Sequence, residues 1–507
     1  MQPIIRNPRN ASEKRYDIVV VGGGIYGAMI TLAASMRGLS ALLVEQNDFG
    51  SATSFNSLKT IHGGLRYLQD VNLKLYFQYV RERRWFILNF PDLVEPLPVL
   101  MPIYNQGLRR KSVLSVALTM DKILSAGRNR RMDKAHQLPF GKIINREETI
   151  NLFPAVDQKG LKGSAYWYDA CMPDPQLLLV AVVKKACAMG ATALNYCRAS
   201  ELIVKNNRVV GLVALDEVSG QKYNFYTPLV VNATGPWVRQ MSRIFDVEYA
   251  DLFKYSIAWN VLFKREALST HALALAPKIK NAQTYFIHPW KNQLLIGTGH
   301  APRKDLDEHP YPTNDELQTF IEDINRTIPD INLTLQEIEH VYSGFLPVRK
   351  DGTTQLVRDN QIFNHARSGG PAGLYSITAV KYSAAKHLAE ELLKKLFPPT
   401  QTLSIKKLNF GSDSKLRFDR EELSTDPQTT VNRYADQLIT LIGNESVIHL
   451  DDLVLRRTNL GDDPSLAIKI APFICELFQW DDQRRKAEME RLLNHFPYYS
   501  TGSYSNI

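Results

Sequence analysis

The sequence predicts an α/β protein with a Rossmann-type dinucleotide-binding domain. An apolar run at residues 18–21 reads as a buried parallel strand, and a second run at residues 41–44 ends at Glu45. A segment rich in Ala and Leu, with helical character, lies between the two runs. The turn before it carries G-x-G-x-x-G as Gly22, Gly24 and Gly27. Strand, glycine turn, helix, strand and acid in this order are typical of a dinucleotide site.

Each part of this unit has a physical task. Gly22 allows a tight turn, Gly24 lets the backbone approach a pyrophosphate, and Gly27 lets helix and strand pack closely. The helix N-terminus offers free N–H groups and a positive dipole end to phosphates. Glu45, 23 residues after Gly22, is placed to accept hydrogen bonds from a ribose.

Length and composition favour an intracellular protein of two or three domains. The chain has 507 residues and an ordinary apolar content, without a repeat or a low-complexity tract. No signal pattern and no apolar run of about 18 residues is visible. Its four cysteines lack zinc spacing, which favours a reducing compartment and no metal site: Cys171, Cys187, Cys197 and Cys475. We therefore expect a cytoplasmic protein, peripheral on the inner face of the membrane if it touches lipid.

The net charge of +9 favours anionic partners, and residues 106–134 hold much of it. Basic clusters there bracket a helical segment whose apolar face includes Val113, Ala117, Met120 and Leu124. One interpretation is an interfacial helix on a membrane. The other is a core-packed helix with solvated basic ends. Nucleic acid is not expected, because no binding motif accompanies the charge.

Dinucleotide-type elements recur near residues 20, 231 and 376, so one domain built from distant segments is predicted. Residues 1–15 read as a polar, mobile leader. The predicted domains are a dinucleotide domain (14–105, 155–238 and 345–398), a substrate domain with an antiparallel sheet (106–154 and 239–344), and a helical C-terminal cap (400–497).

Four segments carry a family resemblance. They are Ala52-Thr53-Ser54, Ile61-His62-Gly63-Gly64-Leu65-Arg66-Tyr67-Leu68, Val231-Asn232-Ala233-Thr234-Gly235-Pro236-Trp237 and Tyr342-Ser343-Gly344. Together they resemble the FAD-dependent glycerol-3-phosphate dehydrogenases of the D-amino-acid-oxidase-like flavoprotein group. The resemblance extends over nearly the whole chain, including residues 451–458 of the cap.

The resemblance implies FAD as cofactor, bound noncovalently because no attachment cysteine lies near the motifs. The cofactor-binding residues implied by motif and resemblance are Gly22, Gly24, Gly27, Glu45, Thr53, Ser54, His62, Gly63, Gly64, Ala233, Gly235 and Lys381. The implied reaction moves a hydride from a carbinol carbon of the substrate to flavin N5. Electrons then pass to a membrane quinone or another acceptor. The oligomeric state is left open, a homodimer included.

By matching positions, Arg66 and Tyr67 resemble family residues at the substrate's phosphate and glycerol. Arg358 resembles another phosphate-binding arginine, and Lys381 resembles a lysine close to both flavin and substrate. Each has a plainer interpretation as well: an ion pair for Arg66, core packing for Tyr67, and solvated positions for Arg358 and Lys381.

The sequence departs from the family at substrate-facing positions. Leu346 stands where the family has an arginine, Asn260 where it has a histidine, and His300 where it has an acid. With Trp259, Leu346 is expected to make the pocket more apolar, and His300 becomes a candidate base beside its plainer interpretation as a structural histidine. The hypothesis is a dehydrogenase of another hydroxy or amino compound that carries an anionic group. The alternatives are an oxygen-reactive oxidase and a catalytically silent flavin-binding subunit.

Overall fold

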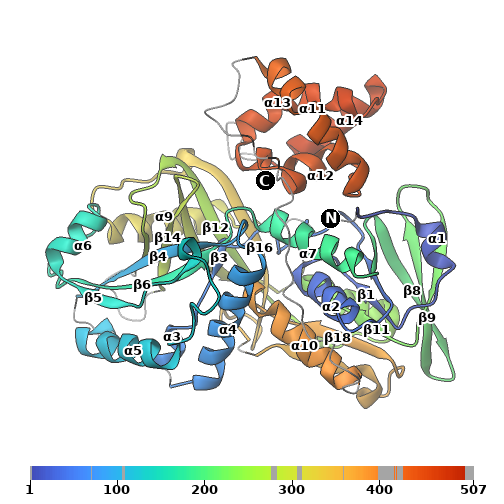
Figure 1. Ribbon diagram of the computed structural model, residues 1–507, viewed down its shortest axis with the longest axis horizontal. Helices are drawn as coiled ribbons and strands as arrows, with labels where there is room; N and C mark the ends of the chain where they lie inside the picture. Colours follow the sequence, from blue (N-terminus) through green and yellow to red (C-terminus); the bar gives the residue numbers. More distant parts are fainter. Residues whose placement is uncertain are drawn as a thin grey trace.

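The computed structural model shows two lobes side by side with a helical cap above them (Figure 1). It describes residues 3–69, 71–104, 109–275, 283–304, 306, 311–357, 359–397, 416, 418 and 426–496. Each lobe is organised around its own β-sheet, and each sheet has helices packed against it (Figure 1).

The first lobe contains a six-stranded sheet in the order β17-β18-β11-β1-β2-β7. Its strands are β1 (Ile18–Val21), β2 (Ala41–Val44), β7 (Thr192–Leu194), β11 (Val230–Asn232), β17 (Gln361–Asn364) and β18 (Leu374–Thr378). Five of them are parallel, and only β17 runs against its neighbour. The sheet therefore joins segments from near residues 20, 231 and 376, as predicted.

Three helices cover this sheet: α2 (Ile25–Ser35), α7 (Pro175–Ala188) and α10 (Ala385–Leu396). All four residues of β1 and of β2 are buried, because parallel strands are covered on both faces. The α2 helix packs on both α7 and α10. Together these elements form the largest apolar cluster of the described chain.

A three-stranded antiparallel sheet extends the first lobe. It consists of β8 (Cys197–Lys205), β9 (Arg208–Asp216) and β10 (Lys222–Tyr226). The predicted turn at Asn206-Asn207 is confirmed, with both residues at positive φ. The expectation of a mobile leader is wrong for the described residues. Short α1 (Pro8–Ser12) packs on β10, Ile4 is buried, and Arg6 forms an ion pair with Asp216.

The second lobe is organised around a nine-stranded sheet in the order β16-β12-β15-β14-β13-β4-β6-β3, with β5 beside β6. Its strands are β3 (Thr60–Ile61), β4 (Glu95–Pro102), β5 (Lys142–Ile144), β6 (Ser164–Cys171), β12 (Lys254–Glu266), β13 (Ala272–Leu275), β14 (Tyr285–Trp290), β15 (Gln293–Pro302) and β16 (Ile338–Val348). All pairings are antiparallel except β13 with β4.

Further helices surround this sheet. They are α3 (Arg66–Gln69), α4 (Leu73–Asn89), α5 (Lys111–Leu124), α6 (Arg146–Leu152) and α9 (Asn314–Thr327), while α8 (Val238–Phe245) follows β11 in the first lobe. Sheet membership divides the chain differently from the predicted ranges. Strands β3, β4 and β6 fall in ranges assigned to the dinucleotide domain, yet they pair in the second sheet. Strand patterns in sequence do not reveal a distant pairing partner, so the exact domain boundaries stay a prediction.

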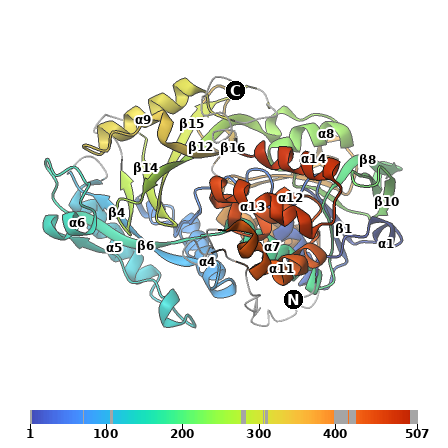
Figure 2. The ribbon, with the colours of Figure 1, turned by 90° about the horizontal axis from the view of Figure 1, so that it is seen from above.

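The cap contains α11 (Pro427–Asn444), α12 (Leu450–Asp452), a π-helical turn (Leu453–Arg457), α13 (Pro464–Leu477) and α14 (Asp482–Leu493). Seen from above, it lies over α7, next to both lobes (Figure 2). The ionic contacts that attach it to the rest of the molecule include one with the loop after β2 and one with the nine-stranded sheet.

The first contact joins the cap to the loop after β2. Arg457 donates two hydrogen bonds to Asp48, at 2.7 and 2.9 Å, and Arg456 donates a third at 2.7 Å. All three side chains are buried. Burial alone would raise the pKa of Asp48, but the two guanidinium groups outweigh it and lower that pKa.

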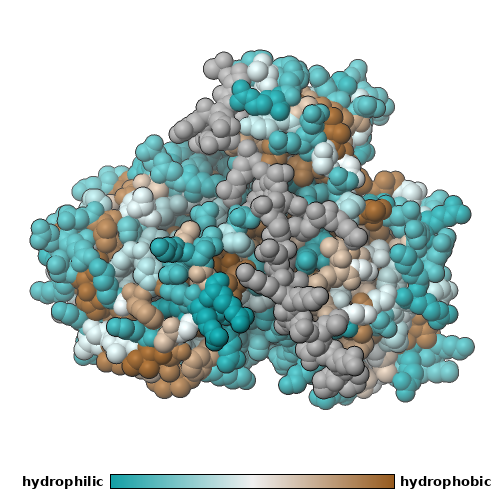
Figure 3. Space-filling view, in the orientation of Figure 1, coloured by the Kyte–Doolittle hydropathy of each residue, from teal (hydrophilic) through white to brown (hydrophobic). Residues whose placement is uncertain are grey.

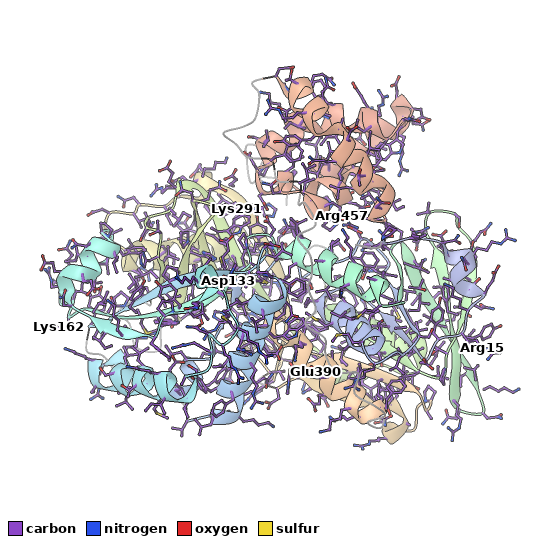
Figure 4. All side chains as sticks on the ribbon, in the orientation of Figure 1. Arg15, Asp133, Lys162, Lys291, Glu390 and Arg457 are labelled. Carbon is purple, nitrogen blue, oxygen red and sulfur yellow. The ribbon has the colours of Figure 1, made fainter. Side chains whose placement is uncertain are left out.

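The second contact joins the cap to the nine-stranded sheet. Lys291 donates to Asp174, at the start of α7, and to Asp462 of the cap. Figure 4 labels Arg457 and Lys291, each at the boundary between the cap and one lobe. Asp48 precedes a loop, residues 50–54, that lines the cavity between the lobes, so its bonds to Arg456 and Arg457 connect that loop to the cap.

Candidate functional site

One elongated cavity of about 390 Å³ lies between the two lobes. At one end it is lined by the first glycine turn, Glu45 and the start of β8. At the other end it is lined by strands β12, β15 and β16 and by the loop before α10. Ser51, Ala52, Thr53 and Ser54 connect the two ends along one wall. The shape suits an extended ligand whose two halves meet different chemistry.

At the first end, close backbone contacts require glycine at two positions of the first turn. Gly22 has a φ of +107°, and a Cβ there would lie 2.6 Å from the carbonyl oxygen of Ala233. A Cβ on Gly27 would lie 1.9 Å from the carbonyl oxygen of Gly22. Gly22 and Gly24 line the cavity, whereas Gly27 supports the turn from behind. Two of the three predicted glycine roles, the turn and the close packing, are therefore visible in the geometry.

Glu45 and Ser54 hold the turn in place. The Glu45 carboxylate accepts a hydrogen bond from the N–H of Gly23, at 2.5 Å, and another from Asn47, at 2.9 Å. Burial raises the pKa of Glu45, although these N–H groups act against the shift. Ser54 Oγ accepts a hydrogen bond, at 3.0 Å, from the N–H of Ile25, which is the first residue of α2. Both predicted residues thus line the cavity and also shape its wall.

The second predicted turn, after β11, lies beside the first, because β11 pairs in parallel with β1. Ala233, Thr234, Gly235, Pro236 and Trp237 all line the cavity. Buried Asn232 braces them, because its Oδ1 accepts from Thr234 Oγ1 at 2.7 Å and its Nδ2 donates to the Val238 carbonyl at 3.0 Å. Ala233 and Gly235 therefore lie where the sequence placed them, and Asn232 is their support.

The other end of the cavity is uncharged along its sheet wall. Leu346, Asn260 and Thr298 line it, from β16, β12 and β15. Thr298 Oγ1 donates to Asn260 Oδ1 at 3.1 Å. Trp259 does not line the cavity, because successive residues of a strand face opposite sides. It packs near Phe320 with ring centroids 6.4 Å apart, so only Leu346 of the expected pair adds apolar surface.

A cluster of cations and phenols adjoins this end. Lys381 Nζ donates to Tyr67 Oη, and Arg66 donates to the same oxygen at 3.2 Å. The Tyr67 and Tyr79 rings stack with centroids 5.3 Å apart, and Lys381 Nζ lies 4.2 Å from the Tyr79 centroid. Lys381 joins the cluster to the cavity, since its neighbours Val380 and Tyr382 line the cavity. Its carbonyl accepts from Tyr26 Oη at 2.6 Å.

This cluster is electrostatically unusual. Burial, with the nearby charge of Arg66, lowers the pKa of Lys381 to about 8. Burial works to raise the pKa of Tyr67, but Lys381 and Arg66 outweigh it and lower that pKa. Arg66 and Lys381, both predicted site residues, therefore contact the same oxygen of Tyr67, although Lys381 lies more than 300 positions after the other two in sequence.

His62, Gly63 and Gly64 form the loop before α3 and do not belong to the cavity wall. Asp169 accepts from the N–H of Gly63 at 2.6 Å and from Arg83 at 2.9 Å. A Cβ on Gly63 would overlap Arg83, with 2.0 Å to Nη1. Burial would raise the pKa of Asp169, but contacts with His62 and Arg83 lower it to about 2. The buried ion pair between Arg83 and Asp169 therefore holds this loop in place.

His300 lies beyond the cavity wall. Its Nε2 is 2.8 Å from Ser256 Oγ, and that hydroxyl donates to the Leu346 carbonyl at 3.0 Å. The histidine therefore donates to Ser256, and burial lowers its pKa to about 4. This arrangement fits a neutral structural histidine better than a base. Arg358 lies outside the described residues.

Several cavity residues had no sequence signal of their own. Tyr26, Thr298, Ala258 and Arg198 line it from α2, β15, β12 and β8. Tyr26 could have been found from its place in the glycine motif, one helical turn from the phosphate-binding end. Arg198 could not, because only the pairing of β7 with β2 carries β8 to the nucleotide end.

The residues at the first end fit a dinucleotide such as FAD. A Cβ on Gly22 or Gly27 would overlap backbone, the helix α2 begins at the cavity, and an acid stands at the tip of β2. Cys197 lines the same end, but burial raises the pKa of its thiol to about 12, which makes it a poor nucleophile. This supports noncovalent attachment.

Known proteins agree with this geometry. Residues 17–384 match the FAD dependent oxidoreductase family. The chain is 30% identical to a glycerol-3-phosphate dehydrogenase of Synechocystis over 79% of this chain and 74% of the relative. It is 28% identical to the aerobic glycerol-3-phosphate dehydrogenase of Bacillus subtilis over 75% of this chain and 67% of the relative.

Solved structures share the fold. A glycerol-3-phosphate dehydrogenase of Bacillus halodurans complexed with FAD superposes with a TM-score of 0.70, covering 97% of this chain and 96% of that chain at 22% identity. An L-α-glycerophosphate oxidase of Mycoplasma pneumoniae with FAD bound gives a TM-score of 0.54, covering 76% of this chain and 95% of that chain at 15% identity.

Proposed function

Because the chain belongs to the FAD-dependent oxidoreductase family, and to the glycerol-3-phosphate dehydrogenases within it, we propose that it oxidises an anionic hydroxy compound other than glycerol 3-phosphate. The chain is an FAD-dependent enzyme of the glycerol-3-phosphate dehydrogenase type. FAD supplies the hydride acceptor when bound. The protein's own residues decide which carbinol carbon is presented to it.

The carrying observation is the contrast between the two walls at the substrate end. Arg66 and Lys381 form a cationic corner that adjoins the cavity beside Val380 and Tyr382, whereas Leu346 and Asn260 make the sheet wall neutral. The cationic corner supports binding of an anionic group. The neutral wall supports a second substituent that is uncharged, since loss of one bidentate guanidinium contact removes about 1.5–3 kcal/mol of binding to an anion.

The test is anaerobic bleaching of the flavin by glycerol 3-phosphate beside a panel of other anionic hydroxy compounds. We expect glycerol 3-phosphate to bleach slowly and another member of the panel to bleach fast. The double variant Leu346→Arg and Asn260→His is expected to gain at least about tenfold in apparent affinity for glycerol 3-phosphate. Val204→Arg, at an exposed position of β8, is the matched control. Fast bleaching of the unmodified protein by glycerol 3-phosphate would contradict the proposal.

The electron acceptor follows from a second feature, the surface of α5. Leu114, Ala117 and Leu118 pack inward, while Val116 is 60% exposed and Ile123 is 70% exposed. Apolar surface gathers over α5 at the lower left of the molecule (Figure 3). Basic side chains flank it at Arg110, Lys111 and Lys122.

We infer that this face rests on anionic lipid, from which a quinone takes the electrons. Within the described residues, no helix combines the length and the apolarity needed to cross a bilayer. The location in the cell and a homodimer stay predictions. An oxidase would instead show rapid reoxidation of the bleached flavin by air, and a silent subunit would show no bleaching by any compound.

A further inference from the structure

The substrate end needs a proton acceptor, and the expected imidazole is missing. Removing a hydride from a carbinol carbon leaves a ketone only if the hydroxyl proton also departs. Asn260 stands at the family's histidine position, and its amide does not take up a proton. His300 already donates to Ser256, whose hydroxyl donates to the Leu346 carbonyl, and burial lowers the pKa of His300 to about 4, so its free proton affinity is weak. A base must therefore come from elsewhere in the site.

Other acidic or phenolic groups of the described cavity wall are poorly suited. Tyr26 donates to the Lys381 carbonyl and Tyr382 to the Pro175 carbonyl, and burial raises the pKa of both phenols. Glu45 lies at the nucleotide end, where backbone N–H groups occupy its oxygens. None of these groups combines proximity to the substrate end with a stabilised anionic form.

Tyr67 combines a stabilised anionic form with a place beside the substrate end, because it is hydrogen-bonded to Lys381, whose chain neighbours Val380 and Tyr382 line the cavity. Its hydroxyl oxygen accepts from two cationic donors, the Lys381 ammonium on one side and the Arg66 guanidinium at 3.2 Å on the other. A phenol oxygen that faces two cations is arranged for the phenolate, because charge-assisted donors stabilise an anionic oxygen far more than a neutral one. The remaining neighbour is Tyr79, whose ring stacks on Tyr67 and which contributes no charge at neutral pH.

We propose that Tyr67, paired with Lys381, is the catalytic base of this enzyme. The substrate hydroxyl proton passes to the Tyr67 oxygen as the carbonyl π bond forms. FAD, the oxidant that the family uses, would take up the hydride with the C–H electron pair. Arg66 and Lys381 hold the phenolate before the step and the phenol after it. This inference rests on the proposed oxidation of a hydroxyl carbon.

The pair is expected to lose a proton near pH 8. Burial and Arg66 lower the pKa of Lys381 to about 8, and the two cations lower that of Tyr67, so the shared proton leaves below the ordinary range of either group. After this proton has left, the hydrogen-bonded Lys381–Tyr67 pair can accept one proton from the substrate hydroxyl. The rate of substrate oxidation should then rise as pH increases through about 8.

The first measurement does not depend on turnover. Tyrosinate absorption of the FAD-loaded protein is titrated and compared with that of Tyr67→Phe. Among the 22 tyrosines, the difference should contain one phenol that ionises below pH 10. Tyr223→Phe, which removes a tyrosine on β10 that is hydrogen-bonded to Gln221, is the control. A difference spectrum that shows Tyr67 ionising at or above pH 10 would overturn the proposal.

The second measurement is the pH profile of anaerobic flavin reduction by whichever compound bleaches the protein. Tyr67→Phe should lower the limiting rate about 10²–10⁴-fold and abolish the rise with pH, with FAD content unchanged. Lys381→Met should move the rise upward by about one pH unit or more, and Lys381→Arg should largely restore it.

The outcomes separate this inference from the proposed function. An unchanged pH profile in Tyr67→Phe, with only a higher KM, would make Tyr67 a binding residue and overturn the base. If no hydroxy compound bleaches the flavin, the proposed function is wrong. The tyrosinate titration would still test whether the pKa of Tyr67 is lowered in the pair with Lys381.

Discussion

The two ends of the cavity are built in different ways. The nucleotide end consists of two short turns, each continuous in sequence, whose backbones approach within van der Waals contact. The substrate end collects side chains from β12, β15, β16 and the loop before α10, and α3 adjoins it through the bond between Tyr67 and Lys381. Backbone contacts leave no room for change without moving a strand, whereas a side chain can be exchanged with the fold intact. This explains why the glycines are retained while Leu346, Asn260 and His300 depart from the family pattern.

The largest expected effect comes from breaking the nucleotide end. Gly27→Ala places a Cβ 1.9 Å from the Gly22 carbonyl oxygen, so α2 or β1 must shift. We expect a loss of FAD and of about 4–5 kcal/mol in unfolding free energy, measured by flavin absorbance per protein and by urea unfolding. Gly127→Ala, where nothing lies within 4 Å of the new Cβ, is the control. A yellow, fully stable Gly27→Ala protein would contradict the account.

The attachment of the cap to the nucleotide end should be the next most sensitive feature. Asp48→Asn leaves Arg456 and Arg457 buried without their shared carboxylate. Removing one member of a buried ion pair costs about 3–5 kcal/mol, which urea unfolding measures. The control is Glu201→Gln, since its exposed pair with Lys222 contributes less than about 1 kcal/mol. Equal losses in the two variants would mean that the buried network does not hold the cap.

A smaller effect is expected behind the substrate end, where the sheet buries His288. Within the described residues its ring nitrogens have no hydrogen-bond partner, and burial, with Lys59 and His62 nearby, lowers its pKa from 6.5 to about 3. The unfolded chain therefore takes up a proton first as pH falls below 6.5, so stability is lost on acidification.

At pH 5 the shifted pKa of His288 is expected to lower the free energy of unfolding by about 2 kcal/mol. His288→Phe should remove it, which unfolding curves at pH 7 and pH 5 would show as a smaller loss than in the unmodified protein. Identical losses in both proteins would indicate that His288 is not the group responsible.

The smallest change in stability is expected at the α5 face. Val116→Ser with Ile123→Ser should alter unfolding free energy by less than about 1 kcal/mol, because both side chains are exposed. Binding to vesicles that contain anionic lipid should nevertheless weaken several-fold in co-sedimentation at low salt. Val218→Ser with Val247→Ser, also exposed but distant from α5, is the matched control. Unaltered vesicle binding by the α5 variant would remove the membrane proposal.

Much of the fold was accessible from sequence because its signals are local. The strand, glycine turn and helix at residues 18–35 form as predicted, as do the hairpin at Asn206-Asn207 and the second turn after β11. Sheet membership was not accessible, since β4 and β6 carry no mark of the strands beside them. Residues 3–15 were misjudged for the same reason: Ile4 packs into the apolar core of the first lobe and its N–H donates to the Asn444 carbonyl of the cap, contacts that no local pattern reveals.

In the candidate site too, residues in local motifs were accessible from sequence, whereas contacts between distant segments were not. Glu45, Thr53, Ser54, Ala233 and Gly235 could be identified from motifs, and all of them line the cavity. The family resemblance pointed to Arg66, Tyr67 and Lys381. It could not say that both cations meet one phenol oxygen. The direction of Trp259 was misjudged, because alternation along β12 turns Asn260 toward the cavity and Trp259 into the core.

The sequence by itself determined the cofactor class, since a dinucleotide is held by backbone, and backbone geometry follows from glycine spacing and apolar runs. Only the tertiary structure decided the chemistry of the substrate end. Lys381 meets Tyr67 across 314 positions of sequence, and Asp48 meets Arg457 across 409. Hydrogen bonds and charges act over a few ångströms in space, so such groups acquire their shifted proton affinities only when folding brings them together.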